Sequence, residues 1–149
     1  MKVDVILNGR AATLEARTDE MLLEVLRRKG LLSVRETCGI GVCGACTVLL
    51  DGEPVSGCLT LAAQAAGHEL TTVEGLTASG VGGAVSRAFD EAHAFQCGWC
   101  TPGFVLTAKA LLEDDPAPSD EAIREALGGN LCRCGCYVKI EEAVRRCAS

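Results

Sequence analysis

Apolar and polar side chains alternate at the start of the chain, which predicts a β-hairpin. Every second position from residue 3 to residue 7 is apolar, as in a strand that buries one face. Asn8 and Gly9 follow, and this pair is the strongest short turn signal between two strands. The alternation continues over residues 12–16, so we expect a second strand there.

The next apolar positions change to helical spacing. Leu22, Val25 and Leu26 lie three and four residues apart, as on one face of a helix. Thr18 precedes them as a candidate N-cap, and Gly30 follows in the position of a C-terminal cap. The pattern predicts one helix between Thr18 and Gly30.

Strand signals return at residue 47. Residues 47–50 and 53–56 flank an Asp-Gly pair, which predicts a second hairpin. We expect a short alanine-rich helical segment at 59–66 and a last strand at 70–73. Two strands, a helix and further strands follow the α+β order of a ferredoxin-like domain with a β-grasp arrangement.

A stretch rich in Gly, Ser and Thr at 74–83 separates this part from a second one. We place the boundary at Leu76, which gives one domain over residues 1–76 and another over residues 77–149. The second domain shows only helical patterns. Its four helices are expected over residues 84–94, from Pro102 onward, over residues 120–127 with Ser119 as N-cap, and over residues 140–147, so it is predicted to be all-α.

The composition favours a metal-binding protein over a secreted one. The chain of 149 residues has ten cysteines but only three Phe, one Trp and one Tyr. Ten cysteines fit either extracellular disulfides or metal ligands. The N-terminus has no apolar run like that of a secretory signal, and the cysteines occur in close pairs. We therefore expect a reduced, cytoplasmic metalloprotein.

Charge and hydropathy exclude two other classes of protein. The net charge is −6 and no extended basic cluster occurs, whereas nucleic-acid binding needs a basic footprint. No segment approaches the roughly 20 consecutive apolar residues that span a membrane. We expect neither nucleic-acid binding nor a membrane span, and an acidic protein of this kind is suited to docking against other proteins.

Three cysteines lie within nine residues of one glycine-rich loop. Cys38, Cys43 and Cys46, with Cys58 further on, have the spacing C-x4-C-x2-C…C of plant-type [2Fe–2S] centres. The intervening glycines let backbone N–H groups approach the cluster. The same glycines match G-x-G-x-x-G, but no helix signal follows them, so we reject dinucleotide binding. The four cysteines are the predicted ligands of a first [2Fe–2S] cluster.

Four further cysteines lie in the predicted helical domain. Cys97 and Cys100 form a C-x2-C pair, and Cys132 and Cys134 form a C-x-C pair. The spacing alone fits a structural zinc site as well as a second [2Fe–2S] cluster. We favour a second cluster, because two redox centres in one chain can conduct electrons whereas one centre beside a zinc cannot.

Three motifs together resemble a known family. They are the loop 38–46 with Cys58, the segment Gln-Cys-Gly-Trp-Cys-Thr-Pro-Gly at 96–103, and the segment Gly-Asn-Leu-Cys-Arg-Cys at 129–134. In this order they resemble the small iron–sulfur subunit of the xanthine dehydrogenase family. That family contains the molybdenum hydroxylases, such as aldehyde oxidoreductases, aerobic carbon monoxide dehydrogenases and dehydrogenases of N-heteroaromatic compounds. The resemblance covers essentially the whole chain.

The resemblance implies a division of labour among subunits. A large subunit would carry a molybdopterin-type molybdenum cofactor and hydroxylate the substrate, and a medium subunit would carry FAD. Electrons would pass from molybdenum through the two clusters of this chain to the FAD subunit or another acceptor. This chain would carry out no substrate chemistry itself. The subunits would form a hetero-oligomer, either a heterotrimer or a dimer of heterotrimers.

The resemblance also implies where each cluster lies. The cluster of the first cysteine set would lie nearer the flavin partner, and the cluster of the second set nearer the molybdenum. Gln96 and Cys134 match the positions that contact the molybdopterin in the family.

One departure from the family pattern concerns the last cysteine motif. The family commonly continues Cys-Arg-Cys-Thr-Gly-Tyr, whereas this chain has Cys-Arg-Cys-Gly-Cys-Tyr at 132–137. We take Cys134 as the ligand, Cys136 as a thiol that holds no metal, and Cys147 as free. Trp99, inside the C-x2-C motif, either shields the cluster from water or packs in an interface.

Two alternative functions use the same cysteines. One is a free-standing two-cluster ferredoxin, and the other is a zinc-stabilised interaction module. The glycine-rich C-x4-C-x2-C loop disfavours zinc, because structural zinc sites more often use closer pairs. A helical domain with a glutamine beside its cysteines disfavours a free-standing ferredoxin, and co-purification with a large molybdenum subunit would decide the question.

Overall fold

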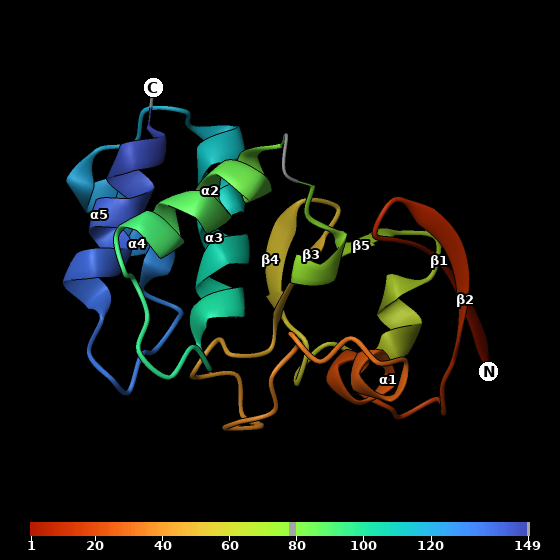
Figure 1. The fold of residues 1–149 in the computed structure, drawn as a ribbon. Helices are drawn as coiled ribbons and strands as arrows, with labels where there is room; N and C mark the ends of the chain where they lie inside the picture. The colour runs from red at the N-terminus through yellow and green to blue at the C-terminus, as the bar shows by residue number, and fades with distance from the viewer. Residues whose placement is uncertain (78–79, 149) are drawn as a thin grey trace.

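The alternating apolar positions form one five-stranded sheet. The computed structural model describes residues 1–77 and 80–148, so residues 78 and 79 of the predicted linker lie outside the described part. The strand order is β2-β1-β5-β3-β4, with β1 parallel to β5 and the other neighbours antiparallel (Figure 1). The strands are β1 Lys2–Leu7, β2 Arg10–Glu15, β3 Thr47–Leu50, β4 Glu53–Ser56 and β5 Glu69–Thr71.

Both predicted hairpins are confirmed, because β1 pairs with β2 and β3 pairs with β4. Their turn residues adopt the positive φ angles that such turns require, for example 52° at Asn8 and 77° at Gly9. The alternation places Val3, Val5 and Leu7 in the core. The last strand is shorter than predicted, since β5 ends at Thr71.

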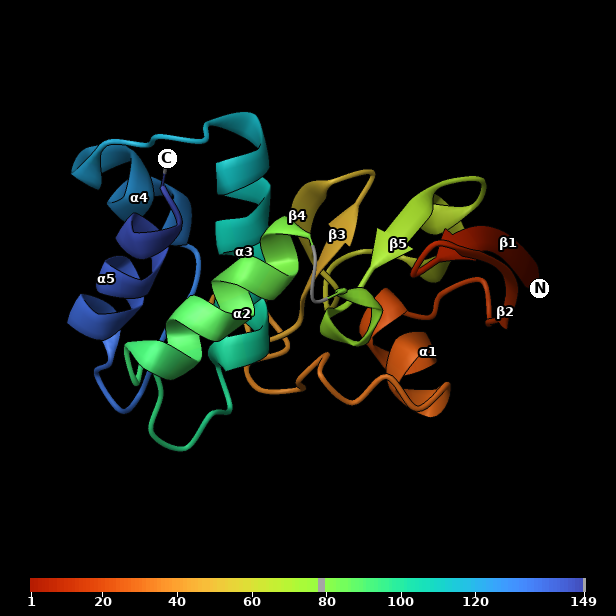
Figure 2. The same ribbon diagram turned by 45° about the horizontal axis from the view of Figure 1, so that its top comes forward.

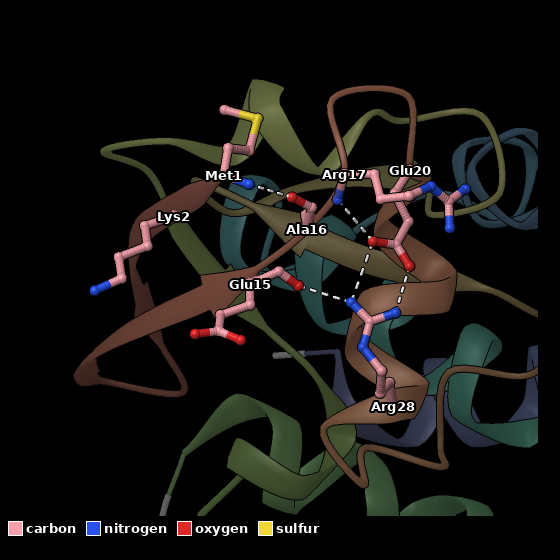
Figure 3. A pocket seen from close by; sticks show the side chains of 7 residues that line it. All are labelled: Met1, Lys2, Glu15, Ala16, Arg17, Glu20 and Arg28. Carbon is pink, nitrogen blue, oxygen red and sulfur yellow. Dashed lines mark hydrogen bonds and ion pairs between the residues drawn. The ribbon is translucent and has the colours of Figure 1, made fainter.

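Helix α1 spans Leu22–Arg28, and its N-cap is Met21 instead of Thr18. The predicted start was wrong because Glu20 turns inward (Figure 3). Its side chain is only 4% exposed, and its carboxylate accepts hydrogen bonds from the Arg17 backbone N–H at 3.0 Å and from the Arg28 guanidinium. The segment before α1 therefore places the buried Glu20 carboxylate against the partly exposed Arg28 and does not continue the helix.

The first hydrophobic core lies between the sheet and α1. A short 3₁₀ helix, η1 (Ala62–Ala65), stands where the alanine-rich helical segment was predicted, and it closes one side of this core. A second 3₁₀ helix, η2 (Val73–Gly75), follows β5. The largest fully buried side chains here are Leu14, Leu22, Leu26, Leu70 and Val3.

The second half of the chain is helical, as predicted. Its helices are α2 Val81–Glu91, α3 Thr101–Asp114, α4 Asp120–Leu127 and α5 Tyr137–Cys147. Pro102 lies in the first turn of α3, and the Ser119 hydroxyl caps α4 by accepting a hydrogen bond from the Ala122 N–H at 3.2 Å. The second core is built on Phe89, Phe104, Ile123, Ile140 and Val144.

Helix α3 is shared by the two halves. It packs against α2, α4 and α5 on one side and against β3 and β4 on the other (Figure 2). Within the described ranges, no helix combines the length and apolar character needed to cross a bilayer.

Asn130 joins the two halves at a buried seam beside α3. It is 4% exposed, and its amide nitrogen donates to the Gly44 carbonyl at 3.1 Å. The amide oxygen accepts from the Thr107 hydroxyl at 2.9 Å. A Cβ at Gly44 would collide with Gly129 O and with Asn130, and one at Gly103 would collide with Gly44 O. The backbone at Gly44 can therefore approach Gly129 and Gly103 this closely only because Gly44 and Gly103 have no side chains.

Substituting alanine at Gly44 should destabilise the protein more than the same change at Gly39. Both glycines have positive φ, 70° and 68°, but only Gly44 faces a close neighbour. We expect Gly39→Ala to cost about 1–2 kcal/mol from backbone strain, and Gly44→Ala to cost about another 1–3 kcal/mol from overpacking. Urea unfolding of the holoprotein measures both, and equal losses would contradict a tightly packed seam.

Glu20→Gln should lower stability at neutral pH. The hydrogen bond from Arg28, and then the Arg17 N–H, lower the pKa of Glu20 from 4.5 to about 2. A carboxylate whose pKa is depressed by folding stabilises the fold above its unfolded pKa and loses that contribution as the pH falls. The stability gap between wild type and variant should therefore narrow as the pH falls from 4.5 toward 2.

The matched control for Glu20→Gln is Asp19→Asn. Asp19 is the preceding residue and also pairs with an arginine, Arg17, but both side chains of that pair are exposed. Exposed pairs contribute little, so thermal unfolding of Asp19→Asn should match wild type. A pH-independent gap for Glu20→Gln would contradict the ionic explanation.

Candidate metal centres

The cysteines of the first predicted set meet in two pairs. Cys38 and Cys43 lie in the loop between α1 and β3, and their thiols are in hydrogen-bonding contact. Cys46 at the end of the loop contacts Cys58, which follows β4. The first pair is half-buried and the second pair is buried. The structure thus brings all four residues together from two separate segments.

Backbone N–H groups point at the sulfur atoms of this loop. The Sγ atom of Cys38 accepts from the N–H groups of Ile40 at 3.5 Å and Cys43 at 3.4 Å. Cys43 Sγ accepts from the Ala45 N–H at 3.4 Å. Gly39, Gly41 and Gly44 all have positive φ, which turns successive amides inward. Such donors stabilise negative charge on thiolates and on a bound cluster.

One cysteine of each pair has a shifted pKa. The N–H groups of Ile40, Cys43 and Val42 lower the pKa of Cys38 to about 6. Burial raises the pKa of Cys46 to about 11. Metal ligands bind as thiolates, so a metal has to displace the proton from Cys46.

The second predicted set comes from two loops between helices. Cys97 and Cys100 lie between α2 and α3, and Cys132 and Cys134 lie between α4 and α5. The thiols of Cys100 and Cys132 are in contact, and burial raises the pKa of Cys100 to about 12. Cys97 is exposed and Cys134 is half-buried.

Amide donors also face this second set. The Trp99 N–H donates to Cys97 Sγ at 3.5 Å, and the Cys136 N–H donates to Cys132 Sγ at 3.4 Å. Gly98 directly follows Cys97, and Gly135 lies between Cys134 and Cys136. Both glycines have a φ of 76°. The two loops of the second set therefore resemble the first cysteine loop, in that positive-φ glycines accompany N–H groups directed at sulfur.

The thiols fit a dinuclear iron centre. Among the described residues, no three His, Cys, Asp or Glu side chains converge on the position of one metal ion. In the first set the thiols of 38 and 43 and those of 46 and 58 are in contact, and in the second set Cys132 contacts both Cys100 and Cys136. A [2Fe–2S] cluster takes four thiolates shared between two irons, so paired sulfurs with converging amide donors are the donor set that it needs.

Gln96 and Cys134 are also brought together. The side-chain amide nitrogen of Gln96 donates to the Cys134 carbonyl at 3.3 Å. Gln96 is exposed and Cys134 is half-buried, so the pair lies at the surface beside the second set.

Trp99 packs between the two halves of the molecule. Its indole N–H donates to the Thr37 hydroxyl at 2.8 Å, and the Arg35 guanidinium stacks 4.7 Å from its ring centroid. Thr37 and Arg35 precede the first cysteine loop. Of the two predicted roles for Trp99, the interface role therefore has direct contacts in the structure.

The two cysteine sets lie on the same edge of the molecule, at the lower edge of Figure 1. The backbone N–H of Leu131, next to Cys132, donates to the carbonyl of Cys43 at 2.9 Å. A cavity of about 510 Å³ lies between the sets, and its lining includes Cys43, Cys97 and Cys100. The sequence motifs contained Leu131 and Asn130, but nothing in their spacing indicated that they contact the first loop.

Two family models match the chain in succession. A 2Fe-2S iron-sulfur cluster binding domain matches residues 5–73, and a [2Fe-2S] binding domain matches residues 72–145. The first match contains the loop with Cys38 to Cys46 and Cys58, and the second contains the other cysteine pairs.

Relatives match over nearly the whole chain. The nicotinate dehydrogenase small FeS subunit of Eubacterium barkeri is 47% identical over 99% of this chain and 97% of its own length. The xanthine dehydrogenase iron-sulfur-binding subunit of Escherichia coli O157:H7 is 43% identical over 97% of this chain and 92% of its own length.

Solved structures share the same fold. Quinoline 2-oxidoreductase from Pseudomonas putida 86 superimposes with a TM-score of 0.92 at 40% identity, covering 99% of this chain and 92% of that chain. The aldehyde oxidoreductase from Desulfovibrio gigas gives a TM-score of 0.91 at 35% identity, and there the match covers 99% of this chain but 17% of that chain.

The predicted fold class, an α+β ferredoxin-like domain followed by a helical domain, is confirmed by these matches. Both family models describe domains that bind a [2Fe–2S] cluster, which is the cofactor predicted for each cysteine set. The chain belongs to the small [2Fe–2S] iron–sulfur subunits of the xanthine dehydrogenase family of molybdenum hydroxylases.

Proposed function

We propose that this chain is the electron-transfer subunit of a molybdenum hydroxylase complex. Electrons released at a molybdopterin site on a large subunit pass through two [2Fe–2S] clusters in this chain to an FAD subunit or another acceptor. Family membership supports this role, since relatives are small subunits of xanthine, nicotinate and other dehydrogenases. The chain itself performs no substrate chemistry.

Each cluster is assigned to one cysteine set, in the predicted domains 1–76 and 77–149. The paired thiols and converging amide donors support these assignments. The first cluster takes Cys38, Cys43, Cys46 and Cys58, and the second takes Cys97, Cys100, Cys132 and Cys134.

One hydrogen bond carries the electron-transfer proposal. The Leu131 N–H donates to the Cys43 carbonyl at 2.9 Å, and Leu131 is covalently joined to Cys132. A first-set ligand and a second-set ligand are therefore connected by covalent bonds and a single hydrogen bond. Electrons tunnel more readily along such a route than across an open gap, so the contact supports conduction between the clusters.

Two surfaces suit the partner subunits. Ile40 is 67% exposed, and Val42 and Leu59 are also exposed around the first loop, which suits docking of the FAD subunit. Val138, 76% exposed, lies in the first turn of α5, directly after the second set, which suits docking of the large molybdenum subunit. Exposed apolar groups of this kind mark interaction sites. We therefore propose a hetero-oligomer, a heterotrimer or a dimer of heterotrimers.

The compartment proposed for this complex is the cytoplasm. All ten cysteines are free thiols in the structure, and thiols stay reduced in the cytosol.

Ligand variants test the two assignments separately. The purified complex should contain about four iron atoms per copy of this chain and show two [2Fe–2S] EPR signals after reduction. Cys38→Ala should abolish one signal and Cys132→Ala the other, because each removes one ligand of one cluster. Iron analysis should fall by about half in each variant.

The control for these variants is Cys147→Ala, which removes a thiol near the end of α5 outside both sets. It should keep both signals. A colourless protein with stoichiometric zinc would overturn the proposal, and two clusters in a chain that never associates with a molybdenum subunit would favour the free-standing ferredoxin.

The Gln96→Ala substitution tests the proposed contact between Gln96 and the molybdopterin of the large subunit. We expect both EPR signals and the iron content to be unchanged, because Gln96 is not a ligand. Reduction of the clusters by substrate should slow by about 10- to 100-fold, as is usual when an outer-shell hydrogen bond is lost. Stopped-flow absorbance with nicotinate or xanthine as trial substrates measures this, and an unchanged rate would contradict a contact with the molybdopterin.

A further inference from the structure

One arginine contacts both cysteine sets, the first through its backbone and the second through its side chain. The Arg35 N–H donates at 3.1 Å to the carbonyl of Ala45, which lies between two predicted ligands of the first cluster. The Arg35 guanidinium carbon lies 4.7 Å from the ring centroid of Trp99, and Trp99 lies inside the C-x2-C motif of the second set. Arg35 is therefore held beside both proposed clusters.

The ring on which Arg35 stacks is itself fixed in place. The Trp99 indole N–H donates to the Thr37 hydroxyl at 2.8 Å. Trp99 and Thr37 both line the cavity of about 510 Å³ between the two sets. A guanidinium over the face of an indole is held there by cation–π attraction. The positive charge of Arg35 is thereby retained near this cavity.

The charge of Arg35 has no counter-ion in the described part of the chain. Within residues 1–77 and 80–148, none of the ion pairs includes Arg35. Its Nε atom is enclosed and has no hydrogen-bond partner among the same residues. An arginine remains protonated in proteins, and enclosed charged groups are normally paired because an unpaired one is costly. The arrangement therefore calls for negative charge from another source.

We propose that the fixed charge of Arg35 stabilises the reduced forms of both [2Fe–2S] clusters and raises their reduction potentials. This inference rests on the proposed assignment of the clusters to the two cysteine sets. A cluster held by four thiolates carries net negative charge, which is one of the quantities that set its potential. The clusters thus supply the counter-charge that the described residues do not.

The direction of the effect follows from charge. Reduction adds one electron to a cluster, while Arg35 neither gains nor loses a proton. A fixed positive charge nearby stabilises the more negative, reduced state more than the oxidised state. Partly buried charges are screened less by water and salt than exposed ones. Removing the charge of Arg35 should therefore make both clusters harder to reduce.

Three substitutions in the assembled complex separate charge from packing. Arg35→Gln removes the charge, whereas Arg35→Lys keeps a charge but lacks the planar group that stacks on an aromatic ring. Glu36→Gln is the matched control, because it also changes the charge by one unit, at the next residue, whose side chain is exposed. Redox titration monitored by EPR gives the potential of each cluster, and the two signals are assigned with Cys38→Ala and Cys132→Ala.

In Arg35→Gln we expect both signals to keep their full intensity and both to titrate at more negative potentials. The iron content should equal that of wild type. Arg35→Lys should titrate closer to wild type than Arg35→Gln does, because the charge is retained. Glu36→Gln should leave both potentials unchanged, because exposed charges are screened.

Several results would overturn the inference. Unchanged potentials in Arg35→Gln would place the counter-ion of Arg35 elsewhere, such as on a carboxylate of a partner subunit, and a shift in one cluster alone would contradict a charge that acts on both. Loss of either signal would assign Arg35 to cluster insertion.

The other variants add two contradicting outcomes. A lysine variant that shifts as far as the glutamine variant would attribute the effect to packing, and an equally large shift in Glu36→Gln would attribute it to the net charge of the chain. Failure of the proposed function is distinguishable, because the wild-type complex itself would then lack one of the two signals.

Discussion

The arrangement of the two halves of the molecule depends on the hydrogen bonds made by the buried side chain of Asn130. Its amide donates to the Gly44 carbonyl in the first cysteine loop and accepts from Thr107 in α3. A buried amide that loses its partners costs more than the bond contributes when formed. The seam therefore tolerates only one placement of the two halves, and that placement brings Cys43 beside Leu131.

The cysteine loops are built for amide donors at the expense of hydrophobic burial. The positive φ angles of Gly39, Gly41 and Gly44 turn the N–H groups of the residues that follow them toward sulfur, and these glycines contribute no apolar side chain to either core. Loops of this kind gain little from the hydrophobic effect. Bound clusters would add to the order that the Asn130 seam supplies, so we expect cofactor insertion and folding to be coupled, as is general for small metal-binding domains.

Features set by neighbouring residues were predictable from the sequence. The period-two pattern placed Val3 and Val5 in the core, and Ser119 caps α4 as expected. The spacing of Cys38, Cys43 and Cys46 indicated the cofactor of the first set because these residues are close in sequence, whereas the spacing of the second set fitted zinc as well. Features set by distant partners were not predictable. The prediction of Thr18 as an N-cap was wrong because Glu20 pairs with Arg28. No sequence signal indicated the partner of Asn130, which lies 86 positions away, or the contacts of Cys136.

Helix α3 belongs to both halves, packing against α2 and α5 as well as β3. Domains joined by a flexible linker can reorient, and electron transfer between them can then be gated by motion. A helix that is part of the second core and also packs against strands β3 and β4 of the first half removes that freedom. The separation between the two redox centres is consequently a constant of the folded subunit, so any control over electron flow has to act where this subunit meets its partners.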